Sequence, residues 1–286
     1  MGSGLSSFLL VCSSSSSSTS SVPLIPPETT LGDLPESVVG SILVYLNPQQ
    51  ICRLASLNRA FRHASSAEFV WESKLPTNYD LLLSRVFGNN ELSSVVCKKQ
   101  IYAKLSSPSS IDGGTKKVWL DKGTGKACML ISSGGLAITG IDDRRYWSWI
   151  STEESRFRSV AYLQQIWWFE VDGEVEFPFP CGTYTLYFRL QLGRSGRRFG
   201  RRVCNSDHVH GWDIKPVKFQ LSTSDGQKAI RECYLTNLGK WNHYEAGDFV
   251  VEDSKEPMKV KFSMTQIDCT HTKGGLCVDS VLIRPK

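Results

Sequence analysis

The chain has 286 residues, 41% of them hydrophobic and 21% charged, so it can bury a sizeable core and is neither disordered throughout nor a fibrous repeat. Its 33 basic and 28 acidic residues give a net charge of +5, which is only a weak argument for a polyanionic partner. The longest purely apolar run, Phe8 to Cys12, is far shorter than a bilayer span, so we expect no transmembrane segment.

Residues 1–30 are rich in serine and carry a single charge, Glu28, which predicts a disordered tail. The first six residues match the pattern for myristoylation of Gly2, with Cys12 as a conceivable second acylation site. An unmodified tail is the alternative. Because one acyl chain holds a membrane only marginally, we expect no stable membrane association.

The cysteines indicate a reducing compartment. The nine cysteines are spread along the chain without a Cys-x-x-Cys pair, and no Asn-x-Ser/Thr sequence occurs. A secreted disulfide framework has denser and usually even-numbered cysteines. No basic residue precedes the short apolar run near the N-terminus, so a secretory signal peptide is not predicted. We therefore expect free thiols and a location in the cytoplasm, the nucleus or both.

Three short helices are predicted between residues 31 and 78. Asp33, three residues before a glutamate, is typical of a helix start. Asn47, followed directly by proline, is a favourable N-cap for a second helix, and residues 58–64 predict a third. Apolar side chains face more than one side of these helices. They either pack against the C-terminal region or are covered by a partner.

A Leu-Pro pair at 34–35, a Leu-x-Pro restart at 46–48 and a closing Trp71 stand at the spacing of an F-box, which this region resembles. The resemblance implies docking onto a Skp-type adaptor and, through it, onto the cullin scaffold of an SCF ubiquitin ligase. The adaptor-binding residues that it implies are Leu34, Pro35, Ile42, Leu43, Leu46, Pro48, Ile51, Leu54, Leu57 and Trp71.

Residues 79–114 are expected to connect two domains. Apolar residues at helical spacing between Glu91 and Leu105 predict one or two helices, and the Ser- and Gly-rich stretch from Ser106 predicts a flexible linker. The second domain is expected to begin near Thr115. A rigid helix before a short linker would hold that domain at a set distance from the adaptor.

From residue 115 to residue 286 the apolar pattern changes to a period of two, with many short strands and frequent turn residues. This pattern predicts an antiparallel β-sandwich and, for the whole chain, an α+β multidomain protein with a small three-helix N-terminal module. Asp172-Gly173 and Asp225-Gly226 are predicted hairpin turns. The alternating acidic residues from Glu170 to Glu176 indicate a solvated strand edge rather than the carboxylate pair of a glycosidase.

No motif predicts catalysis. Gly123 to Lys126 lacks the first glycine and the hydroxyl residue of a phosphate-binding loop. Cys204, His208 and His210 lack a second pair at zinc-ligand spacing, and no nucleophile motif occurs. We expect a non-catalytic subunit that needs no cofactor and no metal.

Two tryptophans allow two interpretations. Trp147 and Trp149 share one face of a predicted strand, because side chains two residues apart point the same way. They either belong to the core, which the periodicity favours, or form a rim on which a sugar ring could pack.

A glycine-rich segment carries five arginines and accounts for the whole excess of positive charge. It is either a solvated loop or a patch for nuclear import or nucleic acid. It lacks aromatic residues at base-stacking spacing, so no specific nucleic-acid binding is expected. The five arginines of this basic loop are Arg194, Arg197, Arg198, Arg201 and Arg202.

Three blocks, at residues 135–149, 210–216 and 273–285, resemble the phloem protein 2 lectins, the Nictaba-type family, and together span nearly all of residues 115–286. The resemblance implies a jelly-roll-like lectin sandwich that binds N-acetylglucosamine oligomers or N-glycan cores. The family's carbohydrate-binding positions fall on Gly140, Trp147, Lys259 and Gln266, and only Trp147 keeps the family's residue type.

Taken together, the two resemblances imply a plant substrate-recognition subunit of an SCF-type E3 ubiquitin ligase. Its lectin-like domain would select a glycoprotein or another protein target for ubiquitylation. The alternative is a receptor whose β-sandwich binds a protein surface without carbohydrate recognition, with the basic loop against an acidic patch.

Overall fold

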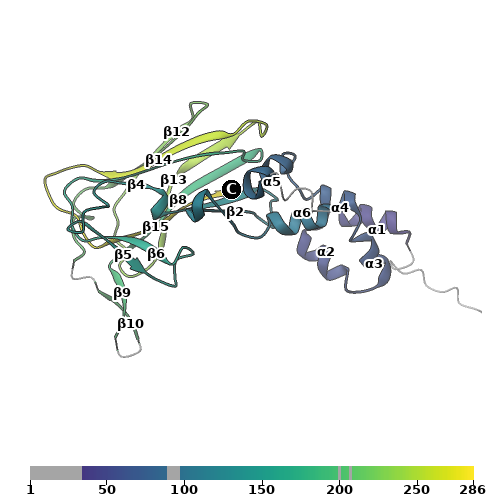
Figure 1. Cartoon of the computed structure of the whole chain (residues 1–286), viewed down its shortest axis with the longest axis horizontal. Helices are drawn as coiled ribbons and strands as arrows, with labels where there is room; N and C mark the ends of the chain where they lie inside the picture. Colours follow the sequence, from purple (N-terminus) through teal and green to yellow (C-terminus); the bar gives the residue numbers. More distant parts are fainter. Residues whose placement is uncertain (1–33, 89–96, 199–200, 206–207) are drawn as a thin grey trace, which may run out of the picture.

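The computed structural model describes residues 34–88, 97–198, 201–205 and 208–286. The helices lie at one end of an elongated molecule and the strands make up the rest (Figure 1). The helices are α1 (Glu36–Leu43), α2 (Pro48–Leu54), α3 (Arg59–Ala64), α4 (Glu68–Glu72), α5 (Tyr79–Phe87) and α6 (Lys98–Leu105).

Side-chain caps define the starts of α2 and α3. The side chain of Asn47 accepts a hydrogen bond from the backbone N–H of Gln50 at 2.9 Å, and the Gln50 side chain accepts one from the backbone N–H of Asn47 at 3.0 Å. Asn58 caps α3 by accepting from the backbone N–H of Phe61 at 2.9 Å. Each cap satisfies a donor that the first helical turn leaves free, and both predicted starts are confirmed.

The other helices differ in part from the prediction. Helix α1 begins at Glu36, and the predicted start signal at Asp33 lies outside the described residues. Helix α4, which contains Trp71, and helix α5 were not predicted as separate elements. Helix α6 occupies the C-terminal part of the predicted connector helix.

The strands form two antiparallel sheets. One comprises β1 (Ser109–Ile111), β2 (Lys116–Leu120), β3 (Ala127–Ser132), β5 (Trp147–Ser151), β6 (Ser159–Leu163), β8 (Gly182–Leu192), β13 (Asn242–Val251) and β15 (Leu276–Pro285). The other comprises β4 (Ala137–Ile138), β7 (Phe169–Phe177), β11 (Val217–Thr223), β12 (Lys228–Cys233) and β14 (Met258–Gln266). A separate pair consists of β9 (Arg194–Arg198) and β10 (Arg201–Asn205).

The eight-stranded sheet has the order β1-β2-β3-β15-β6-β5, with β8 paired to both β15 and β13. The five-stranded sheet has the order β12-β11-β14-β7-β4. All of these pairings are antiparallel. The expected architecture, a small helical module followed by an antiparallel β-sandwich, is confirmed.

The two predicted hairpin turns have different outcomes. Asp225-Gly226 does connect β11 to β12, with Gly226 in the left-handed region at φ +92°. Asp172-Gly173 was wrongly predicted as a turn, because it lies in the middle of β7. A Cβ atom on Gly173 would stand 2.3 Å from the ring of Phe262, so this glycine allows a close approach between neighbouring strands.

The predicted flexible linker contains a strand. Ser109–Ile111 forms β1, which pairs with β2, so the eight-stranded sheet begins before residue 115. Strands β6, β12 and β13 were also missed by the sequence analysis. All residues of β12 are exposed or half-buried, so this strand shows no clear alternation of apolar and polar residues.

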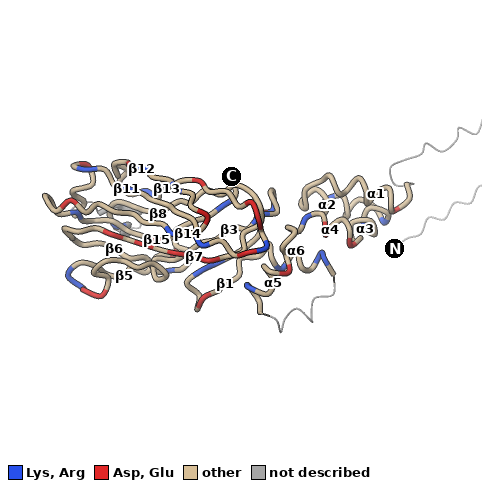
Figure 2. Tube along the Cα trace, turned by 90° about the horizontal axis from the view of Figure 1, so that it is seen from above, with Lys and Arg blue, Asp and Glu red and all other residues tan. Residues whose placement is uncertain are grey.

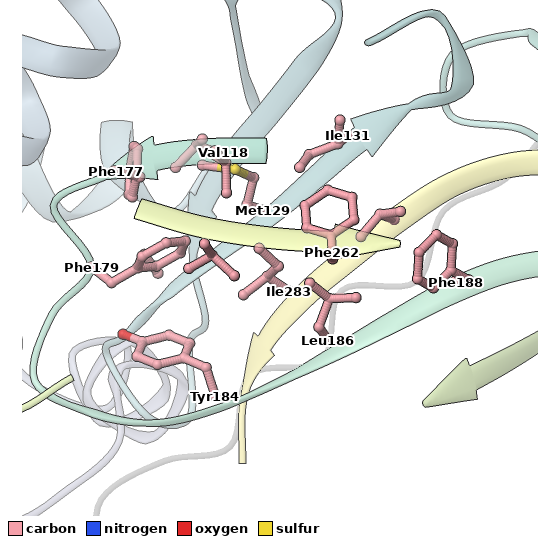
Figure 3. Packing of buried hydrophobic residues seen from close by; sticks show 14 of the residues in the cluster. Val118, Met129, Ile131, Phe177, Phe179, Tyr184, Leu186, Phe188, Phe262 and Ile283 are labelled. Atoms are coloured by element: carbon pink, nitrogen blue, oxygen red, sulfur yellow. The ribbon is translucent and has the colours of Figure 1, made fainter. Parts of the chain in front are cut away.

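Aromatic side chains fill the space between the sheets (Figure 3). The ring of Phe179 lies 5.0 Å from that of Phe177 and 5.2 Å from that of Tyr184, measured between centroids. The hydroxyl of Tyr184, which is buried, donates to the backbone carbonyl of Pro180 at 2.8 Å. Burying a polar group costs little free energy when the group has a hydrogen-bond partner. The Tyr184 hydroxyl can therefore lie in this core.

The helical end is joined to the sandwich by specific contacts. The side-chain N–H₂ of buried Asn78 donates to the carbonyls of Pro178 and Ser254, both at 3.0 Å. Arg85 on α5 forms an ion pair with Asp112, just after β1, at 2.8 Å. These bonds fix the position of α5 on the sandwich, so the two parts of the chain share one continuous structure.

Candidate functional site

The residues that the F-box resemblance implies for adaptor binding separate into three groups by exposure. Leu43 and Ile51 are fully buried, Trp71 is 3% exposed and Pro48 is also buried. These four hold the helices together and cannot contact a partner in this structure, which corrects their assignment to the docking surface. Pro35, Ile42 and Leu57 are exposed, and the remaining residues, Leu34, Leu46 and Leu54, are half-buried.

Trp71 is a core residue of the helical module. Its indole N–H donates to the backbone carbonyl of Ser65 at 2.6 Å, and its ring centroid lies 5.4 Å from that of Tyr102 on α6. The tryptophan therefore packs the F-box-like helices against the connector helix. Its role is to join these elements, because a buried ring with a satisfied N–H stabilises the packing of its neighbours.

A stripe of exposed apolar residues runs along α1 and its C-terminal end. Val38, Ile42 and Tyr45, which we call the α1 stripe, are 44%, 43% and 89% exposed. Their spacing of four and three residues places them on one face of the helix, opposite the buried Val39 and Leu43. The sequence analysis left Val38 and Tyr45 out of the docking set, although their helical spacing was available as a signal.

The four positions carried over from the lectin family do not form one site. Trp147 is 2% exposed, its N–H donates to the backbone carbonyl of Thr139 at 3.0 Å, and its ring stacks on Phe169 at 6.4 Å. Its place in the core, which periodicity favoured, is confirmed. A ring held in this way cannot pack against a sugar, which corrects its tentative assignment to carbohydrate binding.

The other three positions are also unlike a binding constellation. Gln266 is buried and donates to the carbonyls of Gly211 and Lys215, so it ties a loop to the end of β14. Lys259 precedes it by seven residues on the same strand, about 23 Å along an extended chain, and pairs with Glu174 at 3.1 Å. Gly140 is exposed in the left-handed region, at φ +76°.

Exposed tryptophans lie elsewhere on the sandwich. Trp149, Trp167 and Trp168 are 51%, 52% and 45% exposed, and the N–H of Trp168 donates to Glu170 at 2.9 Å. The ammonium group of the buried Lys273 donates to the backbone carbonyl of Trp167 and holds this segment in place. Burial lowers the pKa of Lys273.

An open groove of about 580 Å³ crosses the solvent-facing side of the five-stranded sheet. Asp172, Ser263, Gln220 and Ile230 stand opposite one another on four neighbouring strands and form one row across it. Among the described residues, the side chains of Asp172, Ser263 and Gln220 have no hydrogen-bond partner. Burial, with a smaller effect of the Glu170 carboxylate, raises the pKa of Asp172.

A second row beside the first balances the charge of the groove. Glu174, Lys261, Ser222 and Lys228 stand opposite one another on the same four strands. Acidic and basic residues are likewise interspersed along the sandwich as a whole (Figure 2). A groove with two carboxylates, two ammonium groups and free hydroxyl and amide groups suits a neutral ligand rich in hydrogen-bonding groups.

The basic loop is a β-hairpin in its backbone. Arg194–Arg198 pairs with Arg201–Asn205, with Arg197 opposite Arg202 and Arg198 opposite Arg201. This corrects the expectation of an irregular loop, and the hairpin projects from the sandwich in Figure 1. The side chains of Arg197, Arg198, Arg201 and Arg202 lie outside the described part, whereas Arg194 is described and exposed.

The described residues offer neither a metal-binding cluster nor a membrane-spanning helix. No group of three or more His, Cys, Asp or Glu side chains there is placed to hold a metal ion. No helix in the same part of the chain is long and apolar enough to cross a bilayer. Cys128 in the core is a free thiol, as are Cys52, Cys97, Cys181, Cys233 and Cys269. Gly2 and Cys12, the candidate acylation sites, lie outside the described residues.

Comparison with known proteins identifies both parts of the chain. Residues 126–285 match the family described as Phloem protein 2, and residues 31–75 match the F-box-like family. The chain is 62% identical over 257 residues to F-box protein PP2-A13 of Arabidopsis thaliana, covering 90% of this chain and 88% of that protein. It is 54% identical to F-box protein PP2-A15 of the same plant over 266 residues, covering 89% and 88%.

Similarity to solved structures is low. A family 35 carbohydrate binding module from Clostridium thermocellum is 12% identical, with a TM-score of 0.33, covering 56% of this chain and 98% of that one. A score of this size supports no inference about the ligand.

Proposed function

The chain belongs to the plant F-box proteins that carry a C-terminal phloem protein 2 domain, and from this premise we propose that it is the substrate-recognition subunit of an SCF-type ubiquitin ligase. The F-box helices dock a Skp-type adaptor, which connects them to the cullin scaffold. The sandwich selects the target. The chain supplies no catalytic group; it brings a target lysine close to the ubiquitin-charged enzyme, because proximity alone accelerates a bimolecular transfer.

The α1 stripe is the observation that carries the adaptor-docking part of this proposal. Val38, Ile42 and Tyr45 are apolar, clustered on one helix face and exposed in the chain alone. Exposed apolar clusters of this kind mark protein-interaction surfaces, since their burial against a partner is favourable. Leu57, at 69% exposure, adds a further apolar side chain on the same helical module.

Co-purification with a Skp-type adaptor tests the docking surface. In the double variant Val38→Asp/Ile42→Asp we expect adaptor binding to fall at least tenfold, because two carboxylates would be desolvated at the interface. Both side chains are exposed, so the helical content and the unfolding midpoint should stay close to those of the wild type. Val250→Asp, a comparably exposed site on the sandwich, is the matched control and should bind normally.

Adaptor binding that survives in the double variant, with the fold intact, would exclude the α1 stripe as the docking surface. Variants of Leu43 or Trp71 are unsuitable for this test. Both side chains are buried, so their loss would unfold the module whether or not they touch the adaptor.

Selection of glycoproteins is the first candidate for the role of the sandwich. The groove on the five-stranded sheet supports it, because the row of Asp172, Ser263 and Gln220 offers unpaired donors and acceptors for hydroxyl groups. On a glycan array, the wild type should bind and Ser263→Trp, which fills the middle of the groove, should not. Trp168→Ala, an exposed side chain outside the groove lining, serves as the control.

Selection of a protein surface without carbohydrate is the second candidate. It is favoured by the burial of Trp147 and by the distance of Lys259 from Gln266, because the lectin family's positions do not converge here. A wild-type chain that binds no glycan on the array but still co-purifies with the adaptor would favour this candidate. Either candidate places the protein with its targets in the cytoplasm or the nucleus, which fractionation of tagged protein would test.

A further inference from the structure

A second cavity, of about 480 Å³, lies at the edge of the eight-stranded sheet formed by β5 and β6, where β9 begins. It is separate from the groove on the five-stranded sheet, because the two share no lining residue. Its lining residues are Arg145, Ser148, Tyr162, Gln164, Gln165, Arg194 and His208.

The described lining of this cavity is rich in hydrogen-bond donors. Each of the described lining side chains can donate a hydrogen bond through a guanidinium, hydroxyl, amide or imidazole group, and none of these described side chains is a carboxylate. Two of the side chains, Arg145 and Arg194, carry a permanent positive charge. Two guanidinium groups among neutral donors are complementary to an anion, because their hydrogen bonds to anionic oxygens are charge-assisted.

Arg145 is held in a defined orientation. The carboxylate of Asp143 accepts hydrogen bonds from its Nε at 3.1 Å and from its Nη2 at 2.7 Å, and Asp143 does not line the cavity. The hydrogen bonds from Arg145 hold the pKa of Asp143 below its usual value, so this carboxylate remains ionised. Nη1 of Arg145 takes no part in the pair and is left to bind an anion.

Arg194 supplies the second charge and is the first residue of β9. It is exposed, and no ion pair between it and a carboxylate occurs in the described part of the chain. The side-chain amide of Gln164, which also lines the cavity, donates to the backbone carbonyl of Arg144 at 3.1 Å, and this bond holds that part of the lining in place. Both guanidinium groups therefore belong to a cavity whose wall is already ordered.

We propose that this cavity binds a phosphorylated side chain of the target protein, with Arg145 and Arg194 as the charged ligands of the phosphate. A phosphate monoester carries close to two negative charges and three acceptor oxygens, which matches two guanidinium groups and several neutral donors. This inference rests on the proposed role of the sandwich in selecting protein targets, and it does not depend on whether a glycan binds to the groove.

Titration calorimetry on the full chain tests the proposal. The probe is a hexapeptide that carries one phosphoserine and no other charged side chain. The wild type should bind this peptide and not the same peptide with serine. Arg194→Gln and Arg145→Gln should each weaken binding by about tenfold or more, because each removes a charge-assisted hydrogen bond. Lys255→Gln loses the same charge at an exposed side chain between β13 and β14, outside the lining of both cavities, and should bind as the wild type does.

Three results would overturn the proposal: no binding of the phosphopeptide, equal binding of a glutamate peptide, or binding that both arginine variants leave unchanged. Thermal unfolding of each variant shows that the fold is retained. Adaptor co-purification provides the independent readout. Cavity variants should keep the adaptor, so loss of phosphopeptide binding is distinguishable from failure of the F-box role.

Discussion

At the scale of single residues, a side chain can keep the residue type of a family's binding position and still have a different role in the structure. Trp147 is the one carbohydrate-binding position at which this chain keeps the lectin family's residue, yet it is a core residue here, stacked on Phe169 and hydrogen-bonded to Thr139. Residue type at an aligned position therefore does not establish contact with a ligand. The exposure of the side chain decides whether it can contact a ligand, and this exposure depends on the strands that cover the ring.

This burial leads to a prediction for Trp147→Ala. The substitution should lower the free energy of unfolding by about 3–5 kcal/mol, because it leaves a cavity and an unpaired carbonyl in the core. Urea unfolding followed by far-UV circular dichroism measures the effect. Trp149→Ala, two residues away but half exposed, is the matched control and should change stability by less than about 1 kcal/mol.

A result in which Trp147→Ala is as stable as Trp149→Ala would contradict the buried position of the ring. Loss of glycan binding in Trp147→Ala would therefore not identify a binding site unless the fold had been shown to survive. Groove variants such as Ser263→Trp avoid this ambiguity, since Ser263 faces solvent.

At the scale of elements, the helix cap at Asn47 was predicted correctly, whereas a position inside a strand was predicted as a turn. Asn47 caps α2 as expected, because an N-cap is a local interaction within three or four residues, and Asn58 caps α3 in the same way. Asp172-Gly173 matched a hairpin signal equally well but lies inside β7. A glycine next to an aspartate fits either a turn or a close strand contact, and only the neighbouring strand decides between them.

The close contact predicts the effect of Gly173→Ala. A methyl group there would meet the ring of Phe262 at 2.3 Å and the side chain of Leu136 at 2.9 Å. We expect a loss of about 1–3 kcal/mol in the free energy of unfolding from overpacking. Gly134→Ala, at a glycine with ordinary φ and open surroundings, should lie within about 0.5 kcal/mol of the wild type. Equal effects in the two variants would mean that β7 and β14 are not packed as described.

At the scale of the whole molecule, the junction between helices and sandwich is the feature that matters most for the proposed function. Asn78 bonds two carbonyls of the sandwich, and Arg85 on α5 pairs with Asp112 beside β1. The strand β1 occupies the stretch that the sequence predicted as a linker. The sandwich is therefore held in one orientation on the helical module, and under the proposed function this contact would set the distance from adaptor to target.

The ion pairs at this junction predict a dependence of stability on pH. Burial disfavours the ionised form of Asp112, but hydrogen bonds from Lys116 and Arg85 outweigh burial and hold the pKa of Asp112 below its usual value. Because the folded pKa is depressed, the contribution of Asp112 is fully present above its ordinary pKa of 3.8 and is lost as the pH falls through the folded value.

Comparison of the wild type with Asp112→Asn tests this contribution. The variant should be less stable at pH 7, and the difference from the wild type should shrink as the pH is lowered below about 4. Urea unfolding between pH 7 and pH 2.5 gives both curves. Asp213→Asn, at an exposed position between β10 and β11, is the control for a general effect of losing one carboxylate. A difference that stays constant down to pH 2.5 would show that the Asp112 charge does not stabilise the junction.

The amino-acid sequence by itself was enough to predict the helical module, the antiparallel sandwich, the side-chain cap at Asn47 and the family of each part. These depend on local periodicity, on caps within one turn and on motifs with fixed spacing. Tertiary structure alone decided which apolar side chains of the helical module remain exposed and that the lectin family's positions stay apart. It also decided that Arg145 and Arg194, 49 residues apart in the chain, line one cavity. Exposure and convergence depend on contacts between residues distant in sequence, and no local pattern contains that information.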